Sequence, residues 1–187
     1  MPAATPPPEH LRQEVQSVLI SEAEIAGRVR ELATEIEQDY TGKELLMVAL
    51  LTGTVPFLAD LMRHITLPLR LDFMGVSSYG DDTAPGELVF TKELRLEARD
   101  RDVLLVDDIL DTGQTLHAVL GKLTDLQPRS LKTCVLLEKT SRRRESVTAD
   151  YVGFEVPDEF VVGYGLDYAE RYRNLPFIGV LKPEVYA

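Results

Sequence analysis

The chain has 187 residues, of which 44% are hydrophobic and 27% are charged, as in an ordinary globular domain with a substantial core. Its net charge of −11 argues against a general nucleic-acid binder, and an anionic substrate would need local positive charge from a metal or a few basic residues. The single cysteine, Cys134, excludes an internal disulfide, and no apolar stretch is long enough to span a membrane. We therefore expect a cytoplasmic protein that binds neither nucleic acid nor membrane.

The N-terminal region starts with a proline-rich segment that lacks both the basic start and the apolar core of a signal peptide. We expect residues 1–12 to form a flexible tail and residues 14–20 to form a short strand. Ser21, followed three residues later by Glu24, is a capping-box pattern that predicts the start of a helix. Apolar residues at helical spacing extend that helix to about Tyr40.

A strand, a turn of small residues and a second helix are predicted next. Residues 45–51 are an unbroken apolar run, typical of a strand that is buried on both faces. Residues 55–64 have a helical pattern, and Thr52 and Gly53 lie between the two elements. Taken alone, these two residues fit an ordinary strand-to-helix turn.

The next segment contains a candidate lid. We expect a strand over residues 67–74, a loop over residues 75–86 and a strand over residues 87–93. The loop carries Ser78 and Tyr79, and its single aromatic residue is flanked by small flexible residues. Such a composition suits a lid that closes over a site and excludes water, although an exposed surface loop would look the same.

The most informative stretch runs from Val103 to Thr115. Four apolar residues lead directly into Asp107 and Asp108, and Asp111 then opens the segment Asp-Thr-Gly-Gln-Thr. Helical spacing follows over residues 115–126. The pattern predicts a strand, an acidic turn, a small polar loop and a helix, and ligands of open parallel sheets bind at this end of the strands.

The loop and the acid pair have complementary chemical capabilities. Thr112, Gly113 and Thr115 offer hydroxyls and an unobstructed backbone beside the free N–H groups of a helix start, which together can bind a phosphate dianion. The acid pair can accept hydrogen bonds from sugar hydroxyls or hold a hard divalent cation. The combination indicates a phosphorylated sugar. The alternative is that Asp111 only caps the helix and the two other acids are solvated.

Downstream of the helix, residues 131–137 predict another buried strand, with Cys134 in the core. Lys139 follows this strand directly, and lysines in such places are usually exposed. We expect residues 142–144, three consecutive arginines, to form a solvated turn or a subunit contact without a catalytic role. The three histidines lack metal-ligand spacing.

The stretch at residues 103–115 closely resembles the phosphoribosyl-diphosphate signature of the type I phosphoribosyltransferases. It is most similar to the hypoxanthine–guanine branch, which has paired acids, two aliphatic residues, Asp-Thr-Gly and a threonine two residues on. Residues 151–167 resemble the C-terminal hood of that family almost residue for residue, and the matches extend over about residues 15–181.

The resemblance implies an α/β fold with a mostly parallel central sheet, helices on both faces and a small hood over the carboxyl ends of the strands. It implies a single domain over residues 13–187, with the hood built from about residues 13–20 and 150–187. The implied reaction transfers the 5-phosphoribosyl group from 5-phosphoribosyl 1-diphosphate to hypoxanthine or guanine, with Mg²⁺, and forms IMP or GMP and diphosphate. The family forms homodimers and homotetramers.

The resemblance also implies roles for particular residues. Asp111 would be the general base at purine N7, and a metal would lie near Asp107, Asp108 and Asp167. The sugar diphosphate would be bound by Thr52, Gly53, Ser78, Tyr79, Asp107, Asp108, Asp111, Thr112, Gly113, Gln114, Thr115 and Arg173. The purine would be bound by Lys139 at its exocyclic group, Phe160 by stacking, Val161 at the ring edge, and Asp167.

One position departs from the family pattern. Most members carry lysine where this chain has Thr52, so we expect Thr52 and Gly53 to contact the diphosphate through their backbone only. The alternatives to hypoxanthine and guanine are the same chemistry on xanthine or adenine, or a nucleotide-binding regulatory protein of the same fold.

Overall fold

The computed structural model describes residues 9–79 and 87–186. Its larger sheet has six strands: β2 (Leu45–Leu51), β3 (Leu69–Tyr79), β4 (Glu87–Lys92), β5 (Asp102–Leu110), β6 (Ser130–Glu138) and β7 (Tyr151–Glu155). They are ordered β4-β3-β2-β5-β6-β7, and every neighbouring pair is parallel except β3 and β4. The predicted mostly parallel α/β sheet is therefore confirmed.

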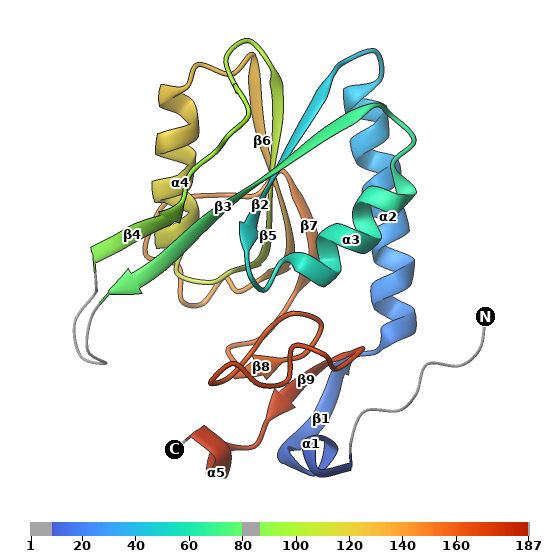
Figure 1. Cartoon of the computed structure of the whole chain (residues 1–187). Coiled ribbons are helices and arrows are strands. Elements are labelled where there is room, and N and C mark those ends of the chain that lie inside the picture. The colour runs from blue at the N-terminus through green and yellow to red at the C-terminus, as the bar shows by residue number, and fades with distance from the viewer. Residues whose placement is uncertain (1–8, 80–86, 187) are drawn as a thin grey trace.

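Three helices cover this sheet: α2 (Glu22–Tyr40), α3 (Val55–His64) and α4 (Gln114–Asp125). Helices α2 and α3 lie on one face and α4 lies on the other (Figure 1). Alternate residues of β2 pack into these two layers, with Met47 in the cluster of α2 and α3 and Val48 in the cluster of α4. Because both faces are covered, β2 is apolar at every position, which is the pattern that its sequence shows.

A three-stranded antiparallel sheet lies beyond the carboxyl ends of the central strands (Figure 1). It consists of β1 (Val15–Ile20), β9 (Ile178–Leu181) and β8 (Val161–Val162), in the order β1-β9-β8. Two short helices, α1 (Glu9–Glu14) and α5 (Pro183–Tyr186), flank it. We call this sheet, its two helices and the chain from residue 157 onward the hood.

The hood contacts the larger sheet through a hydrogen bond and a close backbone approach. The Tyr164 hydroxyl donates to the Asp60 carboxylate of α3 over 2.6 Å. Gly165 has a φ of +102°, and a side chain there would overlap the carbonyl oxygen of Gly53. The hood is thereby held directly above the turn that follows β2.

Several boundaries differ from the sequence predictions. The β3 strand continues through residues 75–79, which were expected to be a loop, because antiparallel pairing with β4 supplies hydrogen-bond partners to their backbone. Residues 9–12 begin a helix rather than continuing a tail, and β7 belongs to the larger sheet rather than to the hood. The rest of the predicted tail, and residues 80–86 of the predicted lid, lie outside the described residues.

The other elements follow the local signals. The Ser21 side chain and the Glu24 carboxylate form the predicted capping box at the start of α2, and α3 spans the predicted residues 55–64. Over the described ranges, none of the helices combines the length and apolarity needed to cross a membrane.

Candidate active site

The acid pair lies within strand β5, near its C-terminal end. The sequence had suggested a turn at this position. The strand continues to Leu110 because that residue still pairs with Glu138 of β6. Asp107 is buried, and its Oδ1 accepts hydrogen bonds from the Thr54 hydroxyl at 3.3 Å and from the Asp108 backbone N–H at 3.0 Å. Two adjacent carboxylates thus face the turn that follows the neighbouring strand β2.

The acid pair is electrostatically strained by burial. The pKa of Asp107 is raised well above its ordinary value. Burial, which removes the carboxylate from water, is the larger cause, and repulsion from Asp108 is the second. Burial also raises the pKa of Asp108, which the positive charge of Arg173 partly opposes. A buried acid beside a half-buried one, both with raised pKa values, forms a site that would gain from a cation or from several hydrogen-bond donors.

The turn after β2 fits closely beneath the acid pair. The peptide bond between Leu51 and Thr52 is cis, the Thr52 side chain is exposed, and Gly53 is buried. A Cβ atom on Gly53 would overlap the Asp108 carboxylate. The backbone of this turn and the acid pair therefore line one cavity.

The loop from Asp111 to Thr115 leads from β5 into α4. Gly113 has a φ of +86° and is the N-cap of α4, so Asp111 does not cap this helix. A Cβ atom on Gly113 would lie 3.2 Å from the Arg143 side chain. The Asp111 Oδ1 atom is buried and has no hydrogen-bond partner among the residues that the structure describes. A site residue, rather than a helix cap, fits this environment.

Lys139 is buried, contrary to the usual exposure of lysines. Its Nζ donates to the carbonyl oxygen of Glu159 over 2.7 Å, and its backbone N–H donates to Leu110 over 2.9 Å. The chain before β8 therefore covers the lysine, which lies close to Phe160 and Val161 in the same cavity.

Arg173 and Asp167 lie on the hood side of the site. The Arg173 Nη1 atom is 3.0 Å from the Asp167 carboxylate and donates to the Gly165 carbonyl over 2.9 Å. The structure thus brings these two predicted site residues together, while their predicted roles stay predictions. Arg173 also pairs with Glu170 at 3.0 Å, so its guanidinium reaches the wall of the site already paired with two carboxylates.

Three adjoining cavities join these groups. The first, about 300 Å³, is lined by Leu50, Leu51, Thr52, Gly53, Val76, Asp107, Asp108, Ile109, Thr115, Asp167 and Arg173. The second, about 270 Å³, is lined by Asp108, Ile109, Asp111, Lys139, Arg142, Phe160, Val161, Leu166 and Asp167. The third, about 160 Å³, is lined by Asp107, Ile109, Leu110, Asp111, Thr112, Gly113, Thr115 and Leu116.

The sequence analysis missed some lining residues. Ile109 borders all three cavities, and no local signal distinguishes it from a core residue. Arg142 borders the second cavity and pairs with Asp158 at 2.6 Å. Arg143 was expected to be solvated as part of residues 142–144, but its half-buried guanidinium donates to Glu138 over 2.7 Å.

Gln114 is not among the described residues that line these cavities, and the contacts predicted for Ser78 and Tyr79 are not tested. Gln114 is the first residue of α4, and its backbone N–H donates to the Thr112 hydroxyl over 3.4 Å. Ser78 and Tyr79 are the last two residues of β3, and their side chains lie outside the described part of the structure. Their predicted contacts stay predictions.

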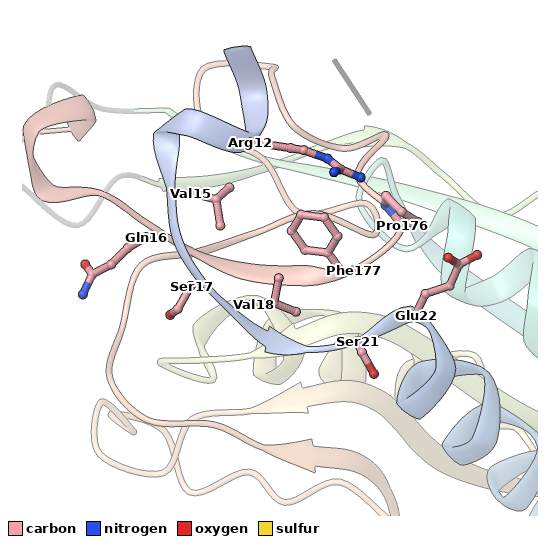
Figure 2. A pocket seen from close by; sticks show the side chains of 9 residues that line it. All are labelled: Arg12, Val15, Gln16, Ser17, Val18, Ser21, Glu22, Pro176 and Phe177. Atoms are coloured by element: carbon pink, nitrogen blue, oxygen red, sulfur yellow. The ribbon is translucent and has the colours of Figure 1, made fainter. Parts of the chain in front are cut away.

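A larger cavity, about 540 Å³, lies elsewhere on the hood (Figure 2). Its lining includes Val15 and Val18 of β1 and Phe177, the residue before β9. None of its lining residues belongs to the predicted site, so size alone does not locate the chemistry here.

Residues 17–169 match the family model described as the phosphoribosyl transferase domain. The chain belongs to the phosphoribosyl transferase family. Hypoxanthine-guanine phosphoribosyltransferase from Bacillus subtilis (strain 168) is 49% identical to this phosphoribosyl transferase over 177 residues, which cover 94% of this chain and 98% of that protein. The bifunctional protein TilS/HprT from Listeria innocua is 48% identical over 180 residues, 96% of this chain, and the chain spans 28% of that longer protein.

A solved structure gives the same result for the fold. The crystal structure of a hypoxanthine phosphoribosyltransferase from Staphylococcus aureus superposes on this phosphoribosyl transferase with a TM-score of 0.92 at 44% identity, covering 96% of this chain and 98% of that one. The family and the type I phosphoribosyltransferase fold inferred from residues 103–115 and 151–167 are therefore confirmed.

Proposed function

We propose that this protein is a purine-salvage enzyme that transfers the 5-phosphoribosyl group from 5-phosphoribosyl 1-diphosphate to N9 of hypoxanthine or guanine. The products are IMP or GMP and diphosphate. The observation that carries this proposal is the meeting of three cavities at Ile109, one with a phosphate cradle, one with an acid pair and one with a buried lysine beside an aromatic ring. The names of the relatives support the choice of bases.

Each part of the substrate has a matching cavity. The cradle from Asp111 to Thr115 binds the 5-phosphate, and Asp107 and Asp108 accept hydrogen bonds from the ribose hydroxyls. The diphosphate lies against the backbone of Thr52 and Gly53 and near Arg173. Gln114, Ser78 and Tyr79 complete the sugar-diphosphate site, the last two as part of a closing lid.

The chemistry of the acids fits Mg²⁺. The raised pKa values of the acid pair indicate uncompensated negative charge, to which a diphosphate would add more. In the described ranges no three side chains of the ligand types form a ready-made metal cage, as is usual for Mg²⁺, which takes one or two carboxylates and completes its shell with phosphate oxygens and water. Among Asp107, Asp108 and Asp167, one or two carboxylates would hold the ion, which would neutralise the leaving diphosphate when bound.

The protein residues carry the remaining chemistry. As N9 attacks the ribose carbon, positive charge develops on the purine, and the Asp111 carboxylate takes the proton from N7. The free, buried Oδ1 of Asp111 suits this task because no neighbouring group in the described structure competes for it. The carboxylates of Asp107 and Asp108 stabilise the positive charge that develops on the ribose ring.

The base cavity selects a 6-oxopurine. Lys139 has only donors when charged, so it pairs with a 6-oxo group and opposes the 6-amino group of adenine. An unmade buried hydrogen bond to a charge costs about 2–3 kcal/mol, which corresponds to roughly 30- to 150-fold discrimination. Phe160 stacks on the base, but stacking does not distinguish adenine because every purine has a face to stack. The backbone of Val161 contacts the ring edge.

Initial rates with hypoxanthine, guanine, xanthine, adenine and uracil at fixed 5-phosphoribosyl 1-diphosphate test the proposal. We expect turnover of hypoxanthine and guanine and little of adenine. Lys139→Gln should narrow the gap, because an amide both donates and accepts, whereas Lys43→Gln at an exposed position should not. Efficient adenine turnover would favour adenine salvage, and no turnover of any base would favour a regulatory nucleotide-binding protein. The cytoplasmic location and the dimer or tetramer stay predictions.

A further inference from the structure

An aromatic cluster on the hood surrounds Phe160. The ring of Phe160 stacks on the ring of Tyr186, with centroids 4.7 Å apart and planes at 22°. The ring of Tyr168 meets Phe160 edge to face, with centroids 5.5 Å apart and planes at 89°. Tyr168 and Tyr186 are themselves edge to face at 6.5 Å. Two tyrosines therefore hold one phenylalanine in both of the geometries that aromatic pairs favour.

The two faces of Phe160 have different neighbours. Phe160 lines the cavity that contains Lys139 and Asp111, whereas neither Tyr168 nor Tyr186 lines it. Helix α5, which carries Tyr186, lies at the end of the hood that points away from the larger sheet (Figure 1). Tyr186 thus covers the side of the ring that faces away from the base cavity.

Main-chain hydrogen bonds fix Tyr186 relative to Phe160. The backbone N–H of Leu181, at the end of β9, donates to the Phe160 carbonyl over 2.8 Å. The next residue, Lys182, donates its N–H to Glu14 over 3.0 Å and accepts from Val185 over 3.0 Å. The α5 helix therefore follows directly after a residue that is hydrogen-bonded to the backbone of Phe160. This connection places Tyr186 next to the Phe160 ring.

Phe160 needs such support because it is 37% exposed and has no place in the buried clusters of the larger sheet. A partly exposed ring without neighbours would populate several rotamers, and binding a base would have to select one of them. We propose that Tyr186 is a positioning residue that fixes the plane of Phe160, so that the free face of the ring is ready to stack on the purine. This inference rests on the proposed role of Phe160 in binding the base.

The test measures KM for hypoxanthine and KM for 5-phosphoribosyl 1-diphosphate separately. Tyr186→Ala should raise KM for hypoxanthine about two- to tenfold, the range of measured aromatic pair energies, with KM for the sugar diphosphate and kcat unchanged. Tyr186→Phe should retain the original KM because stacking needs the ring and not the hydroxyl. Glu184→Ala, at an exposed position of the same helix, is the matched control. If Tyr186→Ala lowers the folded fraction, Tyr186→Leu keeps the apolar bulk without the flat face and should show a smaller rise of the same kind.

A double-mutant cycle separates this inference from the proposed function. Phe160→Leu should raise KM for hypoxanthine by itself, and adding Tyr186→Ala to it should cause no further rise. If Phe160→Leu raises KM but Tyr186→Ala leaves it unchanged or lowers it, the positioning role is overturned while the function stands. If Phe160→Leu has no effect on KM, the stacking role of Phe160 is wrong and the inference falls with it. Equal rises for Tyr186→Ala in both backgrounds would show a general effect on the hood and would also overturn the proposal.

Discussion

Asp72 of β3 and Asp107 of β5 are both buried carboxylates, but their surroundings differ. Asp72 accepts hydrogen bonds from the backbone N–H groups of Phe73, Arg95 and Leu96 at 2.6–2.9 Å, and it pairs with Lys92 at 3.2 Å. Burial alone would raise its pKa, but these donors outweigh that effect and lower the pKa of Asp72 to about 2. Its charge is fully compensated inside the protein.

Asp107 has two donors and a second carboxylate beside it, and its pKa is raised well above the ordinary value by burial and by Asp108. The described residues therefore stabilise the charged form of Asp107 less well than that of Asp72. The difference teaches that burial of an acid does not by itself mark a function. An acid with complete hydrogen bonding serves the fold, whereas an acid with incomplete compensation indicates a ligand.

The largest expected effect concerns Asp111, a third acid, whose buried Oδ1 has no hydrogen-bond partner within residues 9–79 and 87–186. Asp111→Asn removes the proton acceptor for purine N7 and should lower kcat by about 100- to 1000-fold, with a small change in KM for the sugar diphosphate. Because Gly113 is the N-cap of α4, the melting temperature should change little. Steady-state kinetics and a melting curve on one preparation check both parts, and near-normal turnover would remove Asp111 from the chemistry.

Asp72→Asn should act on the fold instead. Each Asp72 oxygen accepts from two donors, so whichever way the amide turns, its NH₂ group faces donors. We expect a loss of about 2–3 kcal/mol in the free energy of unfolding, measured by urea denaturation, with kcat/KM of the folded enzyme nearly unchanged. A large loss of kcat/KM without a loss of stability would contradict the assignment of Asp72 to the fold.

Asp107→Asn should stabilise the protein, in contrast to Asp72→Asn. In buffer with a chelator, the amide removes a repelling charge and keeps an acceptor for the Thr54 hydroxyl, so the free energy of unfolding should rise by about 1 kcal/mol. KM for the sugar diphosphate should rise at the same time. Destabilisation comparable to that of Asp72→Asn would mean that both acids serve the fold.

The lowered pKa of Asp72 should also make the stability of the protein depend on pH. The pKa of Asp72 is about 2 in the folded protein and about 3.9 when unfolded, so the unfolded chain binds the proton more readily between these values. The stability from Asp72 is then fully present above about pH 5 and is lost as pH falls toward 2. The stability difference between the unaltered protein and Asp72→Asn should shrink over that window, and a constant difference would contradict the lowered pKa.

Features set by neighbouring residues could be predicted from the sequence. The capping box of Ser21 and Glu24, the helix at residues 55–64 and the strand, loop and helix over residues 103–126 depend on local patterns, and the structure has them. The hood was predicted only from the resemblance of residues 151–167 to the family, because no local sequence pattern indicates it.

Features set by distant chain segments could not be predicted. The β3 strand is long because β4 pairs with it, and Lys139 is buried because Glu159 covers it from the hood. The pairing of Arg142 with Asp158 and the stacking of Tyr186 on Phe160 likewise join segments whose approach is decided by the tertiary fold. Arginine runs and lone tyrosines carry no sequence signal for such contacts.

The central claim is that the acid pair leaves its charge for a bound cation and a phosphorylated sugar to compensate. Calorimetric titration of 5-phosphoribosyl 1-diphosphate into the unaltered protein, with Mg²⁺ and with a chelator, tests this claim most directly. We predict saturable binding with Mg²⁺ and binding at least tenfold weaker in the chelator, since the diphosphate would then face uncompensated carboxylates. Equal affinity under both conditions, or no binding under either, would contradict the account.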